Sequence, residues 1–383
     1  MIMERNKTLG NIIRESQMPD QLTESVKKLQ TARDSKVILY FLSNRRSPVP
    51  IPGINATFAS EPQLLIYDHL KKLGHVPKLD MVIHTAGGDL NAVWPIVNIC
   101  REMTDHFTVI VPIMALSAGT LLCLGADEVL MCTPACLSPI DPTTANQFNP
   151  EDKRGQPMGI SVEDVTSYLK LVRDKEKGTG ITKEENITRL IEQLTNRVHP
   201  LALGNVNRVH TQVRALAYKL LKLNESKFDN QEHIDRIVKV LTEELQSHSH
   251  QIGVSEATKI FGNNFIKRPA AELENTISDL FECCATKFKI RNTFNVKDWM
   301  GRETQKNLKA VGAMLMSENL THYFIVESII RQLPELPPQV QIQIPPGQQM
   351  PLLPGLPTRI GIEPIKEGWY NIPQDQDGWT DAI

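Results

Sequence analysis

Two adjacent glycines and one serine have the residue types needed for acyl-transfer chemistry. Gly87 and Gly88 stand in "HTAGGDL", directly after an apolar stretch, and Ser117 stands in "ALSAGT". Adjacent glycines let backbone N–H groups face a ligand that a Cβ would obstruct. Attack on an acyl carbon needs a nucleophile, which a serine can supply, and N–H donors for the oxygen that becomes negative.

The segment around Ser117 resembles a nucleophile elbow. Its small neighbours allow a tight turn from strand to helix that projects Oγ outward, although Ala115 replaces the first glycine of GxSxG. The alternative is that Ser117 only caps a helix, as serines at helix starts usually do. The glycine pair favours the catalytic interpretation, with the N–H groups of Gly88 and Ala118 as oxyanion donors and Gly87 lining the same cleft.

Strands that alternate with helices are predicted to position these residues. Apolar, β-branched runs predict strands in "KVILYFLSN", "KLDMVIHTAGGD", "FTVIVPIMAL" and "EVLMCTP", and helical spacing predicts helices in "SEPQLLIYDHLKKLG", "NAVWPIVNICREM" and "SAGTLLCLGAD". This alternation indicates βαβ units and a mainly parallel sheet. Because strand ends and the following helix starts share one edge of such a sheet, both turns are expected to meet there.

The composition divides the chain into four regions. Residues 1–34 form a polar helical lead-in, residues 35–262 a domain that is almost wholly helical after position 161, and residues 263–331 a mixed α/β extension. In residues 332–383 the composition changes, since ten of the 25 prolines fall between 334 and 373. This segment is expected to be extended or disordered, either as a docking site for a partner or as a solvated linker.

Charge and motifs exclude several functions. A net charge of −2 gives no reason to expect a nucleic-acid partner, and no phosphate-binding GxxxxGK[ST] occurs, so the chain does not look like an ATPase. The uncharged run Phe107–Ala126 is interrupted by proline and glycines, which favours a strand, a turn and a helix over a membrane span. The N-terminus is too charged for a secretory signal.

No cofactor or metal is expected. Cys132 and Cys136 lack a matching second pair, and His248 and His250 are typical of an exposed helix end. Most of the six cysteines lie in apolar segments, which suits reduced core thiols and a cytoplasmic location.

Five motifs in the same order resemble the serine dehydrogenase proteinase family. They are "MVIHTAGGDL", "IMALSAGTLLCLGADEVLM", "LSPIDPTT", "HPLALGNVNRVH" and "LTEELQSHSHQIGVSEATKIFG". That family is related to signal peptide peptidase A and to the proteolytic subunit of Clp protease, and the resemblance covers about residues 35–262. It implies the α/β Clp/crotonase fold, hydrolysis of peptides or proteins, and assembly into homo-oligomers.

Carried over by residue, the resemblance makes Ser117 the nucleophile and Gly88 and Ala118 the oxyanion donors. The Clp subunit has a histidine base after the next strand, where this chain has residues 138–141 and no histidine. Signal peptide peptidases use a lysine, which must lose water contact to be neutral near pH 7. The best positional match is Lys170, although it falls away from the centre of its helix's apolar face. The further candidates are Lys153, Lys175, His199 and His210. Asp141 is expected to fix the loop that lines the cleft.

Three functional hypotheses remain at this point. The first is a cytoplasmic serine endopeptidase that needs no ATP by itself. The second is a crotonase-like acyl-thioester enzyme, for which the expected adenine pocket and catalytic carboxylates are not recognisable. The third is a non-catalytic oligomeric scaffold of the same fold that binds partners through its proline-rich tail.

Overall fold

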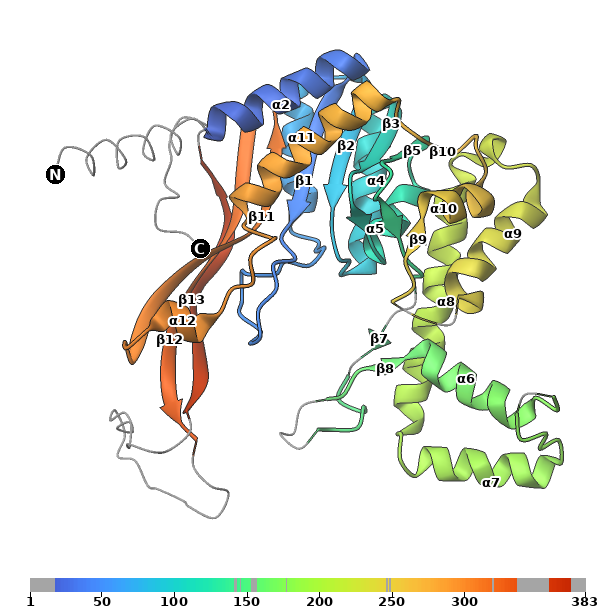
Figure 1. The fold of residues 1–383 in the computed structure, drawn as a ribbon. Helices are drawn as coiled ribbons and strands as arrows, with labels where there is room; N and C mark the ends of the chain where they lie inside the picture. The colour runs from blue at the N-terminus through green and yellow to red at the C-terminus, as the bar shows by residue number, and fades with distance from the viewer. Residues whose placement is uncertain are drawn as a thin grey trace. The chain divides into compact units, whose positions relative to one another are not determined.

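The chain consists of two compact units, each built from segments that are distant in sequence (Figure 1). The computed structural model describes residues 18–140, 143–144, 146–152, 157–176, 178–245, 247, 249–318, 320–335 and 358–372. Unit 1 comprises Met1–Ala86, Ile99–Pro112 and Pro269–Ile383, and unit 2 comprises Gly87–Asn98 and Ile113–Arg268. Helix α4 (Val93–Met103) runs along the chain from unit 2 into unit 1.

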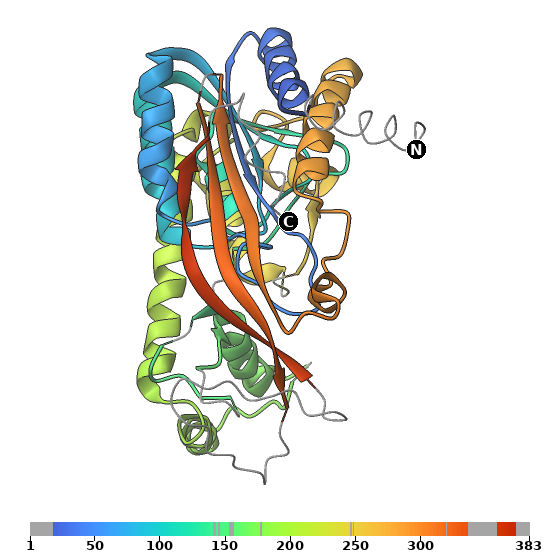
Figure 2. The ribbon, with the colours of Figure 1, turned by 90° about the vertical axis from the view of Figure 1, so that its left-hand side faces the viewer.

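Unit 1 is a sheet with helices on both faces. Its strands follow the order β3-β2-β1-β11-β12-β13, in which β1, β2 and β3 are parallel and the other pairings are antiparallel. Figure 2 shows α2 and α11 side by side on one face and α3 on the other. Its elements are α2 (Met18–Arg33), β1 (Lys36–Leu42), α3 (Pro62–Leu73), β2 (Val76–His84), β3 (Thr104–Val111), α11 (Ala271–Lys287), α12 (Val296–Met300), β11 (Gln305–Ser317), β12 (Leu320–Pro334) and β13 (Thr358–Asn371).

The first half of unit 1 confirms the predicted α/β pattern. All residues of β1 after Lys36 are buried, as expected for a parallel strand covered on both faces. Helix α3 has a proline at its start, where no N–H is needed. It ends at Gly74, which has a φ of 79° and donates its N–H to the carbonyls of Leu70 and Lys71.

The C-terminal strands add an antiparallel layer to the predicted parallel sheet. The region 263–331, predicted only as mixed α/β, supplies α11, α12, β11 and most of β12 to unit 1. The sequence predicts an extended or disordered tail from residue 332. Residues 358–371 are indeed extended, but they pair with β12 along the whole of β13. Ring contacts accompany this pairing, since the Trp369 ring lies 5.7 Å from Phe324 and 6.5 Å from Tyr40. Residues 336–357 and 373–383 lie outside the described residues.

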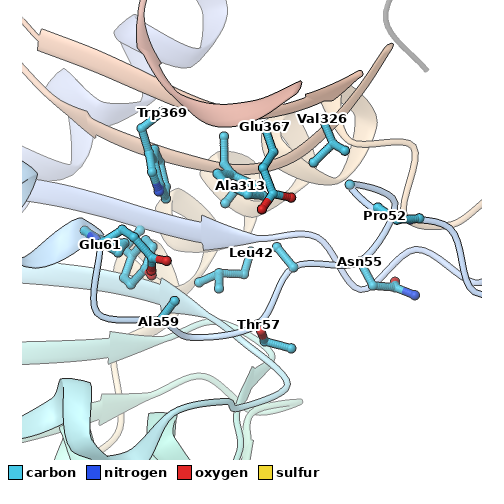
Figure 3. A pocket seen from close by; sticks show the side chains of 15 residues that line it. Leu42, Pro52, Asn55, Thr57, Ala59, Glu61, Ala313, Val326, Glu367 and Trp369 are labelled. Carbon is cyan, nitrogen blue, oxygen red and sulfur yellow. The ribbon is translucent and has the colours of Figure 1, made fainter. Parts of the chain in front are cut away.

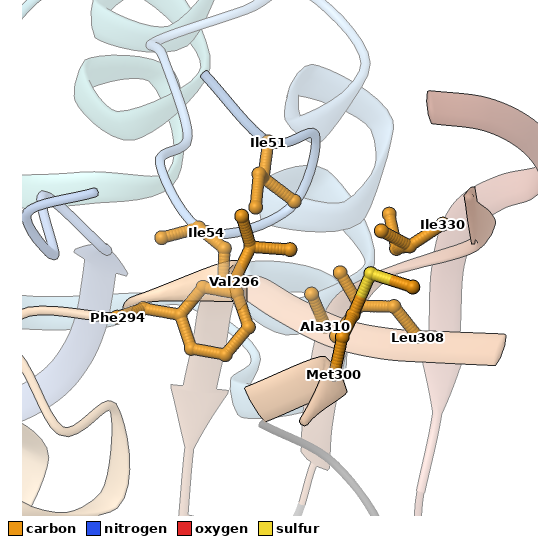
Figure 4. Packing of buried hydrophobic residues seen from close by; sticks show 8 residues of the cluster. All are labelled: Ile51, Ile54, Phe294, Val296, Met300, Leu308, Ala310 and Ile330. Carbon is orange, nitrogen blue, oxygen red and sulfur yellow. The ribbon is translucent and has the colours of Figure 1, made fainter. Parts of the chain in front are cut away.

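The loop after β1 packs against these C-terminal strands in two ways. It lines a cavity of about 270 Å³ together with side chains of β11, β12 and β13 (Figure 3). It also contributes Ile51 and Ile54 to a buried cluster with Phe294 and α12 (Figure 4). The full cluster is Ile51, Ile54, Phe294, Val296, Met300, Leu308, Ala310 and Ile330.

Unit 2 carries the serine turn and the predicted helical region. The short strand β4 (Met114–Ala115) pairs in parallel with β6 (Cys136–Leu137), and β6 pairs antiparallel with β9 (Ile252–Gly253). Strand β5 (Glu128–Met131) pairs in parallel with β10 (Ile266–Lys267), and β7 (Thr143–Thr144) pairs with β8 (Ile160–Ser161). The helices are η1 (Leu90–Ala92), α5 (Ala118–Leu124), α6 (Val162–Arg173), α7 (Glu184–Thr195), α8 (Pro200–Lys222), η2 (Glu225–Lys227), α9 (Gln231–Lys239), the π-helical turn η3 (Val240–Glu244) and α10 (Val254–Phe261).

The uncharged run Phe107–Ala126 folds as predicted, into the end of β3, then β4 and α5. Within the part of the chain that the structure describes, no helix has the length and apolar character needed to cross a bilayer.

Because His84 is buried at the end of β2, we expect the protein to lose stability in acid. Burial lowers the pKa of His84 from 6.5 to about 4, and its ring stacks on Phe41 at 4.7 Å. The unfolded chain therefore binds a proton between about pH 6.5 and pH 4 that the folded chain does not. This contribution to stability is complete above pH 6.5 and declines as the pH falls to 4, by up to about 3 kcal/mol.

Urea unfolding at pH 7.5 and pH 5 measures this effect. We expect His84→Gln to reduce the difference in unfolding free energy between the two pH values. His75→Gln is the control, because His75 is exposed and pairs with Asp105 at 3.0 Å, and it should reduce that difference much less. Equal effects of the two substitutions would exclude His84 as a source of the acid sensitivity.

Candidate active site

The turn after β2 and the turn before α5 are in direct contact. Gly87 has a φ of 103°, and a Cβ built on it would lie 2.9 Å from Ser117 Cβ and 3.0 Å from the Leu116 carbonyl oxygen. Only glycine tolerates both this backbone conformation and this approach. Gly88 also has a positive φ, of 154°. The first glycine is thus needed to let the two turns meet. Gly87, Leu116 and Ser117, which make this contact, all belong to unit 2.

Ser117 has an unusual backbone conformation. Its φ of 50° and ψ of −105° are costly for a residue with a Cβ, and they are a recognised mark of functional sites. Although Ser117 occupies the N-cap position of α5, its side chain makes no capping hydrogen bond. The residue is 9 % exposed. The hydroxyl is therefore not used to cap the helix, which removes the main structural explanation for a serine here.

Ser138 and Thr120 fix the backbone of this turn. The Ser117 N–H donates to Ser138 Oγ at 2.8 Å. The Ser138 N–H donates to Thr120 Oγ1 at 3.0 Å, and Thr120 Oγ1 lies 2.9 Å from the Ala115 carbonyl oxygen and 3.0 Å from that of Ser138. All three side chains are buried or nearly so. The network joins both ends of the turn to the segment after β6.

Sequence analysis missed the role of Ser138 and Thr120. Ser138 drew notice only because a histidine is absent from its segment, and Thr120 only as part of an apolar helix. The pairing of β6 with β4 brings Ser138 to the serine turn from twenty-one residues away. No local pattern encodes such a contact.

Helix α5 begins with Ala118 immediately after Ser117. The first N–H groups of a helix have no carbonyl partner within that helix. All residues of α5 are buried, and Gly125 at its end lies so close to Val97 and Leu220 that a Cβ would meet them at 2.6 to 3.0 Å. This packing holds the helix start, and with it Ser117 and Ala118, in a fixed position.

None of the candidate general bases that the structure describes is hydrogen-bonded to Ser117. Lys170 is exposed on α6, which contacts α8 and β8, whereas α5 contacts β4 and α8. Figure 1 places α6 toward the α7 end of unit 2, away from α5. Lys175 is exposed as well, and His210 is half-buried. Within the described residues, no hydrogen bond joins Ser117 to a lysine or a histidine. The burial expected for a lysine base is thus not seen at Lys170.

His199 has a structural role of its own. It caps α8, since its Nδ1 accepts the Leu201 N–H at 3.2 Å, and its ring stacks on Phe148 at 5.0 Å. Asp141 and Lys153 lie outside the described residues.

The residues considered for metal binding do not form a metal site in the described part of the chain. Cys132 and Cys136 are buried and belong to no disulfide among the described residues, and His250 lies 3.0 Å from Glu256. His248 falls outside the part of the chain that the structure describes, and within that part no cluster of three or more metal-binding side chains is present.

The N-terminal part of the chain is similar to a known protein family. Residues 11–152 match the family model of the ClpP-like SDH-type serine proteinases. The match contains both turns, with Gly87, Gly88 and Ser117, and it confirms the resemblance drawn from the motifs. The match over residues 11–152 supports similarity to a ClpP-like serine protease for this part of the chain.

The curated relatives carry no assigned function. An uncharacterised protein of Methanocaldococcus jannaschii is 28% identical over 194 residues, which is 50% of this chain and 56% of the relative. A second uncharacterised protein of the same organism is 41% identical over 64 residues, 17% of this chain and 22% of the relative. The matches thus span about half and about a fifth of these relatives.

Among solved structures, the chain is similar to two mutants of a membrane-bound stomatin-specific protease. One, in complex with a substrate peptide, is 14% identical, with a TM-score of 0.35 and coverage of 62% of this chain and 78% of that chain. The other is 13% identical, also with a TM-score of 0.35, and coverage is 63% and 84%.

Proposed function

We propose that the protein is a serine peptidase in which Ser117 is the nucleophile. The observation that carries this proposal is the positive-φ conformation of Ser117, held against Gly87 with a hydroxyl that caps nothing. In the first step, Ser117 Oγ bonds to the peptide carbonyl carbon and a base takes its proton. The amine then leaves with a proton, and water hydrolyses the acyl-enzyme. The substrate is a peptide or protein, and no ATP is consumed.

For the oxyanion we propose the backbone N–H groups of Gly88 and Ala118. Both residues adjoin the Gly87–Ser117 contact, and Ala118 begins α5, where an N–H has no helical partner. The Ser117 N–H is already bonded to Ser138, so it is not proposed as a donor. Fixed donors aimed at a developing charge typically contribute on the order of 100- to 1,000-fold in kcat each.

A fluorophosphonate probe tests the proposal on the full chain. We expect one covalent adduct that mass spectrometry assigns to the peptide containing Ser117. The Ser117→Ala variant should give none, while Ser138→Ala should still be labelled. Absence of an adduct on the folded wild-type protein would favour the oligomeric scaffold. Turnover of acyl thioesters without an adduct would favour the crotonase-like enzyme.

Ser138 is expected to support Ser117 by positioning. Ser138→Ala removes the acceptor of the Ser117 N–H and leaves this buried group unpaired, which costs about 1–3 kcal/mol of stability. We expect roughly a tenfold lower kcat with little change in KM, because the hydroxyl of Ser117 is displaced and not lost. Ser138→Thr, which keeps the acceptor, should recover part of the activity. Unchanged kinetics of Ser138→Ala would restrict the network to a structural role.

For the general base, Lys170 stays the first residue to test, on the strength of the resemblance. Its exposure in the single chain means that a working Lys170 must be covered by bound substrate or by a second copy. We expect Lys170→Ala and Lys170→Arg to lose activity equally, by about a hundredfold or more, because a guanidinium cannot accept the proton. Normal turnover of Lys170→Arg would turn the search to Lys153, Lys175, His199 and His210.

Self-association is part of the same proposal. Helix α7 has an apolar stripe that includes Ile187, Leu190 and Ile191, yet none of its residues is buried, and Ile191 is 43 % exposed. A helix with such a stripe gains stability by burying it against another surface. Light scattering on the purified chain would show whether it associates with itself.

A further inference from the structure

The cavity of unit 1 has walls suited to one kind of ligand. The loop after β1 forms one side, and β11, β12 and β13 form the other. All its lining residues belong to unit 1, and none of them is a residue proposed for catalysis. A volume of about 270 Å³ lies just below the usual range for drug-sized ligands, which suits a ligand about as large as an amino acid.

Two carboxylates line this cavity and form no ion pair among the described residues. Glu61 precedes α3 and Glu367 lies on β13, and Figure 3 shows both side chains together with the indole of Trp369 around the same space. Within the described residues neither carboxylate forms an ion pair, and no lining residue is basic. Lys366, next in sequence, lies over the Tyr370 ring at 4.8 Å, and alternation along a strand places it on the other face from Glu367.

The inner wall presents aromatic rings and one buried hydroxyl. Tyr40 and Trp369 line the cavity beside Phe324, with ring centroids 5.7 to 6.5 Å apart. Tyr40 is fully buried, and its Oη forms no hydrogen bond of standard geometry among the described residues. Burial, with a smaller effect of Glu61, raises the pKa of Tyr40, so this group stays a neutral hydroxyl.

The carboxylates, the aromatic rings and the buried hydroxyl of this cavity all suit a cationic ligand. Two carboxylates repel an anion and attract a cation, and aromatic faces bind ammonium and guanidinium groups. A buried hydroxyl oxygen without a partner can accept a hydrogen bond from such a group, which has donors only. The neighbouring segments 336–357 and 373–383 contain no lysine or arginine, so they cannot supply the cation.

We propose that this cavity binds a lysine or arginine side chain, or a small organic cation of the same chemistry. The charged end lies between Glu61 and Glu367, beside the Trp369 ring and the Tyr40 hydroxyl. The aliphatic part lies against the apolar side chains of Leu42 and Val326. The site would select peptides or small molecules by charge. It does not depend on Ser117, so a protein that fails as a peptidase would still bind the cation.

Calorimetric titration of the full chain tests this site with Nα-acetyl-lysine N-methylamide, its arginine counterpart and the uncharged norleucine counterpart. We expect the basic ligands to bind at least tenfold more tightly than the norleucine ligand. Glu61→Gln and Glu367→Gln should each weaken binding of the lysine ligand by about fivefold or more. Glu327→Gln is the matched control on β12, whose side chain alternates away from the lining residue Val326, and it should change binding less than twofold.

Both Glu61 and Glu367 are exposed, so their amide variants should fold normally, and circular dichroism checks this. Equal binding of the lysine and norleucine ligands would overturn the proposal. Equal weakening of lysine-ligand binding by Glu327→Gln, Glu61→Gln and Glu367→Gln would overturn it too, since binding would then depend on net charge alone. Absence of any binding by the three ligands would overturn it as well.

Discussion

Ser117→Ala is expected to abolish peptide hydrolysis, with a loss in kcat on the order of a thousandfold or more, while the protein stays folded. The hydroxyl makes no capping hydrogen bond, so its removal takes no contact from α5. Ser117→Gly should be equally inactive. It should also be more stable than Ser117→Ala by about 1–2 kcal/mol, because glycine adopts a φ of 50° without the strain that a Cβ causes.

Peptide turnover and urea unfolding of the two variants separate chemistry from structure. If Ser117 is the nucleophile and its turn is strained, both variants are inactive and Ser117→Gly is more stable than Ser117→Ala. Wild-type turnover in either variant would exclude Ser117 as the nucleophile. Equal stability of the two would show that the turn carries no strain at Ser117, and its backbone conformation would then lose its weight as a mark of function.

Gly87→Ala is expected to disrupt the site from outside the proposed reacting atoms. The new Cβ would meet Ser117 Cβ at 2.9 Å and the Leu116 carbonyl oxygen at 3.0 Å, and neither neighbour is the flexible end of a side chain. Strain at a φ of 103° adds to this overlap. We expect a loss of roughly 2–5 kcal/mol in unfolding free energy and at least a hundredfold in kcat, since Ser117 must move.

Gly262→Ala is the matched control in the same unit. Gly262 has a φ of 86°, but a Cβ there would find its nearest neighbour at 3.8 Å, an ordinary contact. It should cost only the backbone contribution, about 1 kcal/mol, and leave kcat unchanged. If Gly87→Ala proves no more harmful than Gly262→Ala, the close approach of the two turns has no functional importance.

The parts that local sequence determines could be predicted. The apolar runs and glycines around β1, α3 and β2 fixed these elements to within a few residues, because periodicity and turn residues act locally. The double glycine also indicated a close approach of another group to the backbone. At Gly87 that group is the turn that carries Ser117.

The parts that depend on distant pairing could not be predicted. Ser138 reaches Ser117 only because β6 pairs with β4, and Trp369 orders β13 only because β12 offers Phe324 and β1 offers Tyr40. The proline content of the tail suggested a free segment, yet an edge strand tolerates proline, and Pro364 lies within β13. The general base could not be assigned for the same reason, because the burial of a lysine depends on the whole fold and not on one helix.

The interleaved construction of unit 1 has a consequence for biosynthesis. Strand β1 ends at Leu42, but its antiparallel neighbour β11 begins only at Gln305, about 260 residues later. At a synthesis rate of about 5–20 residues per second, the "KVILYFL" segment of β1 is made roughly 13–50 s before its neighbouring strand β11. An apolar, β-branched edge of this kind pairs readily with other chains. A chain that ends before Gln305 therefore leaves β1 unpaired on this side, and we expect such a chain to aggregate more readily than the full-length protein.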